Sequence, residues 1–301
     1  MRIAEIHSSE LTGHCLRQTY HRLKGEVSGE ATTALYRGLV AGRAIELLHN
    51  HDFVSDPSEL TIEAASDVQK NLLEENRALS ESVERNRGDI LSEVTISVEL
   101  YRDRMSPMFG ETKLIGCELP CRLTLPFGEF ASHMDLVVRD TGNVFGFGHD
   151  RLIVFDWKWR VDVPSPQYLA RNMQFALYYL MTKKGSIRVT ENRGDFDWIE
   201  FGEDAVLGWV HLPNLAPYKR KTVTKDDKGE EREYFKGDLR PNNSIFKFVQ
   251  YDKKQEEEIV NELAMRKKMI ESDIFPLNPD PVSCRICDAE PFCNRFDMPQ
   301  S

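Results

Sequence analysis

The chain has 301 residues, a formal net charge of −10 and 41% hydrophobic residues. This hydrophobic content suffices for a sizeable core and argues against a disordered protein. The charge excludes a generally basic nucleic-acid-binding surface but allows a local basic groove. No apolar run approaches the roughly 18 residues of a membrane span, and the first residues contain no signal-peptide core. We therefore expect a soluble, cytoplasmic protein with no membrane partner.

Residues 8–24 predict a short helix that begins at a serine cap and contains Cys15. A single cysteine in such a helix is usually a small buried residue. Further cysteines that could bind the same metal occur only near the other end of the chain. A linker rich in glycine and serine, residues 25–29, follows. We expect residues 1–30 to form a separate N-terminal unit.

The pattern of residues 31–51 predicts a helix that contains two glycines, Gly38 and Gly42. Each costs about 1 kcal/mol relative to alanine in a helix interior, which suggests that another group approaches this backbone closely. Glu46 and His49 are three residues apart and share a helix face, so either could be a metal ligand. The alternative is an ordinary solvated face.

Residues 57–87 predict a longer, highly charged helix with a role in packing or partner binding. Strands are then expected at 94–100, 114–125 and 129–138. Cys117 and Cys121 stand four positions apart in the second of these strands, which predicts that they share one face. We interpret both as core residues.

The apolar run 152–155 predicts a buried strand that ends with Asp156 and Lys158 on one face. It is joined to the preceding strand, which carries Asp135, by a turn at 140–143. Two carboxylates and an ammonium group can hold a divalent metal beside a fixed cation, as phosphodiester hydrolysis requires. For the D-x-K pattern alone, the alternative is a surface ion pair at a strand end.

A helix predicted from 166 to about 183 carries a polar stripe on an otherwise apolar surface, formed by Gln167, Arg171, Gln174 and Tyr178. A solvent-facing stripe would usually be richer in Glu and Lys. The composition therefore favours a surface turned toward a ligand, with an ordinary exposed face as the alternative.

Residues 195–250 again predict strands, including a hairpin around residues 226–229. Lys219, Arg220 and Lys221 form a basic cluster that could follow a phosphate backbone. The acidic residues that come directly after the cluster equally allow a solvated hairpin. A charged helix is expected at about 253–272.

The tail contains Cys284, Cys287 and Cys293, three thiols in ten residues bracketed by prolines. In a reducing compartment this density indicates ligation rather than packing or disulfides. Cys15 is the natural fourth ligand. Zinc and an iron–sulfur cluster both accept four cysteines, so ligand type alone leaves both open.

Together these motifs resemble the RecB-like branch of the PD-(D/E)XK nucleases, and within it the iron–sulfur exonucleases related to the CRISPR-associated RecB-like exonuclease family and the AddB nuclease domain. The resemblance covers about residues 31–180 and the two cysteine segments. The family order of an acidic residue, D/E-x-K and Q-x-x-x-Y is matched by Asp135, Asp156-Trp157-Lys158 and Gln174-Phe-Ala-Leu-Tyr178. The chain departs from the family's G-x-x-x-H, since Gly42-Arg-Ala-Ile-Glu46 stands in its place. Glutamate is also a suitable ligand for Mg²⁺ or Mn²⁺.

The resemblance implies an α/β fold, with a restriction-endonuclease-like core in which helices flank a central mixed sheet. We expect this core at 31–185, a β-rich extension at 186–250, and a C-terminal helix and cysteine tail at 251–301. An iron–sulfur clasp would join the tail to the helix of 1–30.

The implied activity is that of a Mg²⁺- or Mn²⁺-dependent DNA exonuclease that prefers single-stranded DNA. It would act in recombination, repair or CRISPR-type spacer processing, with recombination or CRISPR-adaptation proteins as partners. One alternative is a nuclease-fold DNA-binding subunit of a larger complex with little activity of its own. Another is a protein with a zinc tail in place of the iron–sulfur cluster.

The resemblance also implies roles for individual residues. Metal ligands would be Glu46, Asp135, Asp156 and the backbone carbonyl of Trp157, with His49 as a less favoured substitute for Glu46. Lys158 would position or activate the attacking water, and Gln174 and Tyr178 would orient Lys158 or the substrate strand. A [4Fe–4S] cluster would be bound by Cys15, Cys284, Cys287 and Cys293, and DNA contacts are expected from Arg171, Lys219, Arg220 and Lys221.

Overall fold

The structure is a computed structural model that describes residues 5–7, 30–75, 77–159, 165–190, 196–211, 220–225, 231–236, 246–272 and 274. Several predictions from the sequence concern residues outside these ranges. They are the helix at 8–24, the four proposed cluster ligands Cys15, Cys284, Cys287 and Cys293, and the basic residue Lys219.

An eight-stranded mixed sheet forms the centre of the fold, in the order β12-β9-β6-β5-β4-β7-β8, with β1 beside β5. Neighbouring strands β4, β5 and β6 are antiparallel, whereas β6 and β9 are parallel. The strands are β1 (Glu5–His7), β4 (Lys113–Leu125), β5 (Gly128–Asp140), β6 (Arg151–Lys158), β7 (Ser186–Thr190), β8 (Phe196–Ile199), β9 (Val206–His211) and β12 (Phe246–Val249). The expected mixed sheet is confirmed.

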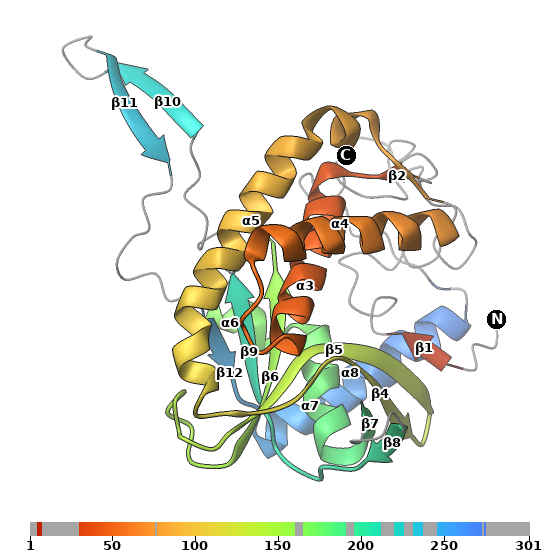
Figure 1. Cartoon of the computed structure of the whole chain (residues 1–301). Helices are drawn as coiled ribbons and strands as arrows, with labels where there is room; N and C mark the ends of the chain where they lie inside the picture. The colour runs from red at the N-terminus through yellow and green to blue at the C-terminus, as the bar shows by residue number, and fades with distance from the viewer. Residues whose placement is uncertain are drawn as a thin grey trace.

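Helices cover both faces of this sheet (Figure 1). On one face lie α3 (Thr33–Asn50), α4 (Pro57–Glu74) and α5 (Glu81–Phe109), and on the other lie α7 (Met173–Lys184) and α8 (Lys253–Glu271). The remaining elements are small: α6 (Pro166–Ala170), the parallel pair β2 (Glu30–Ala31) and β3 (Ala78–Leu79), and the hairpin of β10 (Arg220–Lys225) and β11 (Glu231–Lys236). The architecture is that of a three-layer α/β protein.

Strand β6 is buried on both faces, as its continuous apolar run predicts. Leu152 and Val154 belong to the core beneath α7 and α8, which we call the α7-side core. Ile153 and Phe155 belong to the core beneath α3, α4 and α5, which we call the α3-side core. The strand lies between β5 and β9, and its end brings Asp156 to the middle of the sheet.

The strand predicted at 94–100 is wrong, because these residues lie within α5. Val94, Val98 and Tyr101 are buried at spacings of four and three, which is the period of a helix packed on a core. The helix predicted over 57–87 is likewise divided, since α4 ends at Glu74 and β3 intervenes before α5 begins.

The helix predicted from 166 to 183 is broken between Ala170 and Met173. Asn172 caps the second part, α7, by accepting hydrogen bonds from the N–H groups of Gln174 (2.9 Å) and Phe175 (3.3 Å). An asparagine side chain that binds backbone donors in this way favours a helix start over a helix interior. Gln167 and Arg171 therefore do not continue the α7 stripe that contains Gln174 and Tyr178.

The division expected at residue 185 does not divide the sheet. Strands β7 and β8 extend it beyond β4, and β9 and β12 extend it beyond β6, so residues on both sides of 185 build one sheet. In the described part of the chain, every helix falls short of the length and apolarity needed to cross a membrane.

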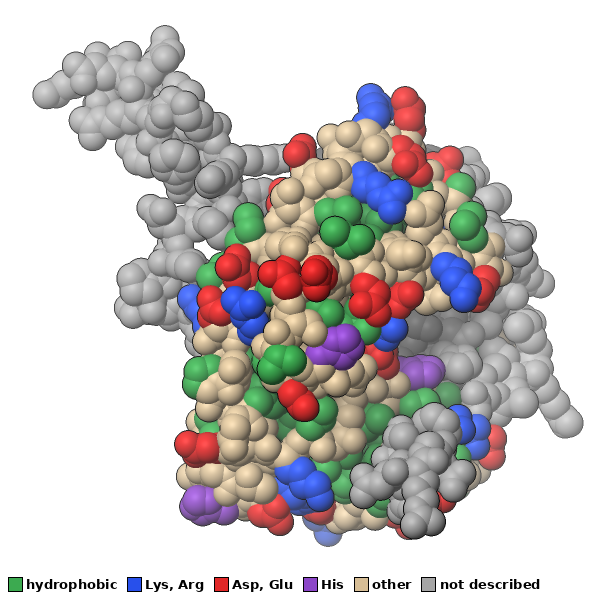
Figure 2. Space-filling view, viewed as in Figure 1, with side chains coloured by type: hydrophobic (Ala, Val, Ile, Leu, Met, Phe, Trp, Pro, Cys, Tyr) green, Lys and Arg blue, Asp and Glu red, His purple; other side chains and the backbone are tan. Residues whose placement is uncertain are grey.

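Acidic and basic side chains are interspersed over the face formed by α3, α4 and α5 (Figure 2). On the described part of this face no broad basic patch is visible, in keeping with the net charge of −10. Any contact with an anionic ligand on this side must therefore come from individual residues in a groove rather than from a basic surface.

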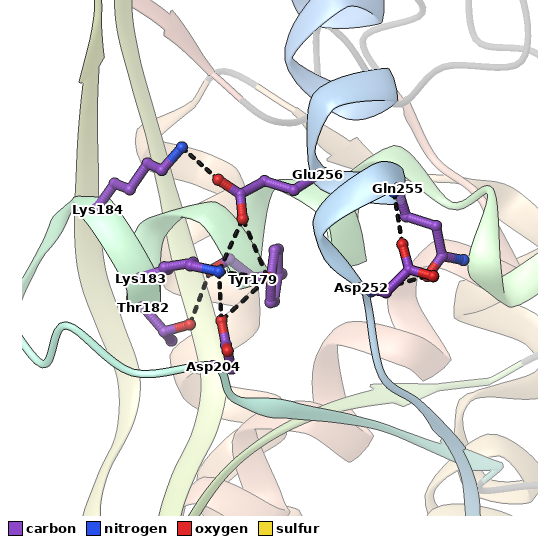
Figure 3. Close-up of polar contacts among 8 residues, drawn as sticks. All are labelled: Tyr179, Thr182, Lys183, Lys184, Asp204, Asp252, Gln255 and Glu256. Atoms are coloured by element: carbon purple, nitrogen blue, oxygen red, sulfur yellow. Dashed lines mark hydrogen bonds and ion pairs between the residues drawn. The ribbon is translucent and has the colours of Figure 1, made fainter.

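A polar cluster ties α7 to α8 on the opposite side of the sheet (Figure 3). Lys183 pairs with Glu256 at 2.8 Å and with Asp204 at 2.7 Å, and Lys184 also pairs with Glu256. The Tyr179 hydroxyl contacts both carboxylates as well. The cluster fixes the orientation of α7, the helix that carries Gln174 and Tyr178.

Candidate active site

Asp135 and Asp156 lie opposite each other on neighbouring strands. The antiparallel register of β5 and β6 ends with the pair Leu136–Phe155, and the two aspartates occupy the next position. Here the backbone N–H of Trp157 donates to Asp135 Oδ2 at 3.0 Å. The structure therefore brings together the two carboxylates that the sequence places twenty-one residues apart.

Lys158 completes this group from β6. Its Nζ donates to Asp156 Oδ1 at 2.6 Å, and the side chains of Lys158 and Asp156 are 28% and 1% exposed. A surface ion pair is therefore the wrong interpretation of the D-x-K pattern. The carboxylate is buried at the centre of the sheet, and the ammonium group is held beside it with access to solvent.

Helix α3 contributes Glu46 to a cleft that Asp135 also lines. The cleft has a volume of about 630 Å³, and Glu46, Asp135 and Trp157 are among its lining residues. Arg43, one turn before Glu46, pairs with it at 2.7 Å and with Asp67 of α4 at 2.8 Å. One guanidinium group thus joins the two helices at the cleft.

A fourth carboxylate, Glu118, was not predicted. The pairs Cys117–Leu136 and Leu119–Met134 flank Glu118 and Asp135, which therefore lie opposite each other on β4 and β5. Glu118 lines the cleft as well. Glu118, Asp135 and Asp156 thus form one row across three adjacent strands. The available signal in the sequence was a single acidic residue within the otherwise uncharged stretch 114–121.

The backbone at Glu118 also explains a wrong prediction. Its φ of +47° lies in the left-handed region, which an extended strand does not use. Alternation is interrupted there, so Cys117 packs against the α3-side core whereas Cys121 belongs to the α7-side core. The two cysteines do not share a face, although Cys121 is buried as expected.

Burial and neighbouring negative charge raise the pKa values of two of these carboxyls. Burial raises the pKa of Asp135 well above its ordinary value, and the charge of Asp156 adds to this effect while Lys158 opposes it. Burial and the charge of Glu46 raise the pKa of Glu118 to about 7, against the opposing charges of Lys158 and Arg43. A divalent cation would relieve this repulsion and favour the ionised forms.

The donor set suits a hard cation. Glu46, Glu118, Asp135 and Asp156 supply carboxylate oxygens from four different elements, and oxygen is the ligand that Mg²⁺ and Mn²⁺ take. Within the described ranges, no three His, Cys, Asp or Glu side chains are already grouped as a finished metal site. Two of the four carboxylates pair instead with cationic side chains, Glu46 with Arg43 and Asp156 with Lys158.

Gln174 and Tyr178 connect α7 to the strand that carries Asp135. Gln174 Nε2 donates to the Tyr178 hydroxyl at 2.7 Å, and this hydroxyl donates to the carbonyl oxygen of His133 at 2.6 Å. Tyr178 is fully buried. These hydrogen bonds run to the backbone of β5, two residues before Asp135, rather than to Lys158.

His49 does not lie with the carboxylates. It is 2% exposed, its Nε2 is 2.9 Å from the Tyr101 hydroxyl, and its ring packs edge-on against Phe53 and Phe109. Burial lowers its pKa to about 3. The structure places His49 in the α3-side core. Of the two alternative metal ligands predicted on α3, Glu46 and His49, only Glu46 lines the cleft.

The structure describes the predicted DNA contacts only in part. Arg171 is exposed in the break between α6 and α7. Arg220 and Lys221 begin β10, and the described residues include only their backbone. A DNA-binding role for these three residues stays a prediction, as does metal ligation by the Trp157 carbonyl.

Comparison with known proteins identifies the family. The family model described as the PD-(D/E)XK nuclease superfamily matches residues 12–294. A search of curated proteins found no match. The matched region contains the row of carboxylates, Lys158 and the helix that carries Gln174 and Tyr178. The chain belongs to the PD-(D/E)XK nuclease superfamily.

Proposed function

We propose that this protein is a Mg²⁺- or Mn²⁺-dependent deoxyribonuclease that degrades DNA as an exonuclease and prefers single strands. The observation that carries the proposal is the arrangement of Asp135 opposite Asp156 with Lys158 held at 2.6 Å from Asp156. Superfamily membership supports metal-dependent phosphodiester hydrolysis. The single-strand preference and exonuclease action rest on the finer resemblance to the RecB-like branch.

The metal would be held by Asp135, Asp156 and Glu46, with the Trp157 carbonyl as a further oxygen ligand. When bound, a divalent cation lowers the pKa of a water ligand and polarises the phosphoryl oxygen. Glu118 lines the same cleft and adds a carboxylate that can accept a hydrogen bond from the attacking water or help to neutralise the cation.

Lys158 acts through its fixed charge. Its pairing with buried Asp156 holds the ammonium group at one place, so little reorganisation is needed when negative charge develops on the phosphate. An ammonium group has three N–H donors, so Lys158 can also orient the attacking water by hydrogen bonding.

Gln174 and Tyr178 act as positioning residues. The chain of hydrogen bonds from Gln174 to Tyr178 to the His133 carbonyl fixes the backbone of β5 just before Asp135. Catalytic groups must be held within a fraction of an ångström, and buried hydrogen bonds of this kind supply that constraint.

A [4Fe–4S] cluster bound by Cys15, Cys284, Cys287 and Cys293 is part of the proposal and rests on the resemblance alone. It would join the unit of 1–30 to the tail of 251–301. Iron and acid-labile sulfide measured after anaerobic purification test it. About four of each per chain are expected, whereas a colourless protein with one zinc would replace the cluster with a zinc tail. Action in recombination, repair or CRISPR-type spacer processing rests on the same resemblance.

Cleavage assays on linear and circular single-stranded DNA test the proposed activity. With Mg²⁺, the wild-type protein should shorten an end-labelled linear strand faster than the same strand in a duplex, and it should leave the circle intact. Cleavage of the circle would contradict exonuclease action. Tight binding without cleavage of any substrate would instead support a DNA-binding subunit that has lost activity.

A further inference from the structure

The active-site cleft continues between helices α3 and α4. At this end its lining comes from Gly38, Leu39 and Gly42 of α3 and from Asp67, Val68, Lys70 and Asn71 of α4, and Asp67 is paired with Arg43 at 2.8 Å. We call this part of the cleft the α3–α4 groove. The motifs that predict catalysis do not account for it, because none of these residues except Gly42 belongs to them.

Two glycines leave the backbone of α3 open to the groove. Gly38 and Gly42 lie one turn apart inside the helix, where each costs about 1 kcal/mol relative to alanine. Packing does not require them. Among the described residues, a Cβ atom at Gly38 would meet nothing within 4 Å, and one at Gly42 would make an ordinary contact with Trp157 at 3.8 Å.

A buried hydrogen-bond donor faces the same place. Trp157 is 6% exposed and lines the cleft, and its indole nitrogen has no hydrogen-bond partner among the described residues. That nitrogen is 3.8 Å from the position a Cβ would take at Gly42. A buried unsatisfied donor costs about 1–3 kcal/mol. An oxygen atom of a ligand resting on Gly42 would come within reach of it.

Lys70, Asn71 and Leu39 fit an anionic chain with apolar parts. Lys70 is 75% exposed at its side chain and pairs only loosely with Glu74, at 3.9 Å. Asn71 offers amide donors, and Leu39 is an apolar side chain that remains 39% exposed. Alternating phosphates and sugars present the same alternation of charge and apolar surface to a protein.

On the basis of the proposed function, we propose that the α3–α4 groove holds the sugar–phosphate backbone of the substrate strand next to the scissile phosphate. Gly38 and Gly42 form the surface on which the strand lies. The Trp157 N–H and Lys70 donate to its oxygen atoms. The groove thereby leads the strand to the carboxylates of β4, β5 and β6.

Steric block of the groove tests this most directly. Gly38→Leu fills the groove, and Gly88→Leu is the matched control, because Gly88 also lies inside a helix and a Cβ atom there would likewise meet nothing within 4 Å among the described residues. Binding of a fluorescein-labelled single-stranded oligonucleotide to the full chain is measured by anisotropy, with Ca²⁺ in place of Mg²⁺. Gly38→Leu should raise Kd by at least about tenfold and Gly88→Leu by less than about twofold.

Measurements of stability distinguish a blocked groove from a folding defect. Gly38→Ala and Gly88→Ala should both raise the melting temperature, because alanine has the higher helix propensity. Only Gly38→Ala should also weaken binding. A more stable protein that binds DNA less well is not expected from a purely structural role of Gly38.

Salt dependence tests the charged contact. Lys70→Gln should reduce the slope of log Kd against log salt by about 1, as expected for one lost phosphate contact. Lys254→Gln is the control, because Lys254 lies on α8 and is similarly exposed beside Glu258 at 3.8 Å. Its slope should equal that of the wild type.

The outcomes separate the groove from the catalytic proposal. If the wild-type protein binds but does not cleave, and Gly38→Leu loses binding, the nuclease proposal fails and the groove stands. If the wild type cleaves DNA and both Gly38→Leu and Lys70→Gln bind the strand with the wild-type Kd, the groove assignment fails and the nuclease proposal stands. If the wild type does not bind the strand, the groove assignment is also overturned.

Discussion

Glu118 and Asp135 lie opposite each other on β4 and β5, on the row that continues to Asp156. Both carboxyls have raised pKa values because burial and neighbouring carboxylates disfavour their ionised forms. Such a row is unfavourable for stability above neutral pH and favourable for binding a cation. Natural active sites commonly retain this kind of local conflict.

Removing the charge at Glu118 should therefore stabilise the metal-free protein at high pH. The pKa of Glu118 is about 7 in the folded protein, above its model-peptide value of 4.5, so its unfavourable contribution is complete above pH 7 and vanishes below pH 4.5. Glu118→Gln should raise the free energy of unfolding at pH 8 by about 1 kcal/mol or less, since the side chain is partly exposed. At pH 4.5 the variant and wild type should agree.

Thermal unfolding in EDTA at both pH values measures this effect. Glu258→Gln serves as the control, since Glu258 is exposed on α8. Added Mn²⁺ should then raise the melting temperature of the wild type more than that of Glu118→Gln. A lower melting temperature for Glu118→Gln at pH 8 without metal would contradict an unfavourable charge at Glu118.

Tyr178→Phe should impair catalysis more than folding. The substitution removes the hydroxyl that donates to the His133 carbonyl and accepts from Gln174 while it keeps the buried ring. We expect kcat to fall by about tenfold or more with little change in KM, because the backbone of β5 at His133, two residues before Asp135, loses the hydrogen bond that positions it. The free energy of unfolding should fall by about 1–3 kcal/mol.

Tyr251→Phe is the matched control for Tyr178→Phe. Tyr251 is also buried, and its hydroxyl has no hydrogen-bond partner within the described residues. Its removal should leave kcat unchanged. Equal kcat values for wild type and Tyr178→Phe would limit Tyr178 to a packing role.

The cluster between α7 and α8 should make stability depend on acid pH. Burial acts to raise the pKa of Glu256, but its hydrogen bonds with Lys183 and Lys184 outweigh burial and lower the pKa (Figure 3). A carboxyl with a lowered folded-state pKa stabilises the fold above its unfolded value of 4.5, and this contribution is lost as pH falls through the folded value.

Glu256→Gln should consequently destabilise the protein by about 1–3 kcal/mol at pH 7. The difference from wild type should shrink as the pH falls below 4.5. Chemical denaturation across this range measures it, with Glu257→Gln as the control at an exposed neighbouring position. A difference that stays constant with pH would mean that the glutamine disturbs packing rather than charge pairing.

The sequence predicted strand β6, which carries Asp156 and Lys158, because its local pattern and its environment agree. Residues 152–155 form a continuous apolar run, and β6 is buried on both faces as such a run requires. Likewise, the turn at 140–143, between Asp135 and Asp156, correctly predicted that β5 and β6 pair as neighbours.

Other features depend on tertiary context that no local pattern carries. Val94 to Leu100 alternates like a strand, but its packing against α3 and α4 selects a helix. Glu118 becomes part of the site only through the register of β4 with β5 and a left-handed backbone at that position. The sequence places Glu46 and His49 on one face of the same helix and does not distinguish them. Their positions in the structure do, because His49 is buried in the core and Glu46 lines the cleft.

The most direct test of the whole account is the rate of Mg²⁺-dependent degradation of a labelled single strand by wild type, Asp156→Asn and the control Asp197→Asn. Asp197 is exposed on β8, at the far edge of the sheet. We predict that Asp156→Asn lowers the rate by about 10²–10³ or more while it still binds the strand, because it loses a metal ligand and the anchor of Lys158. Degradation by Asp156→Asn at the rate of wild type and Asp197→Asn would contradict the assigned site.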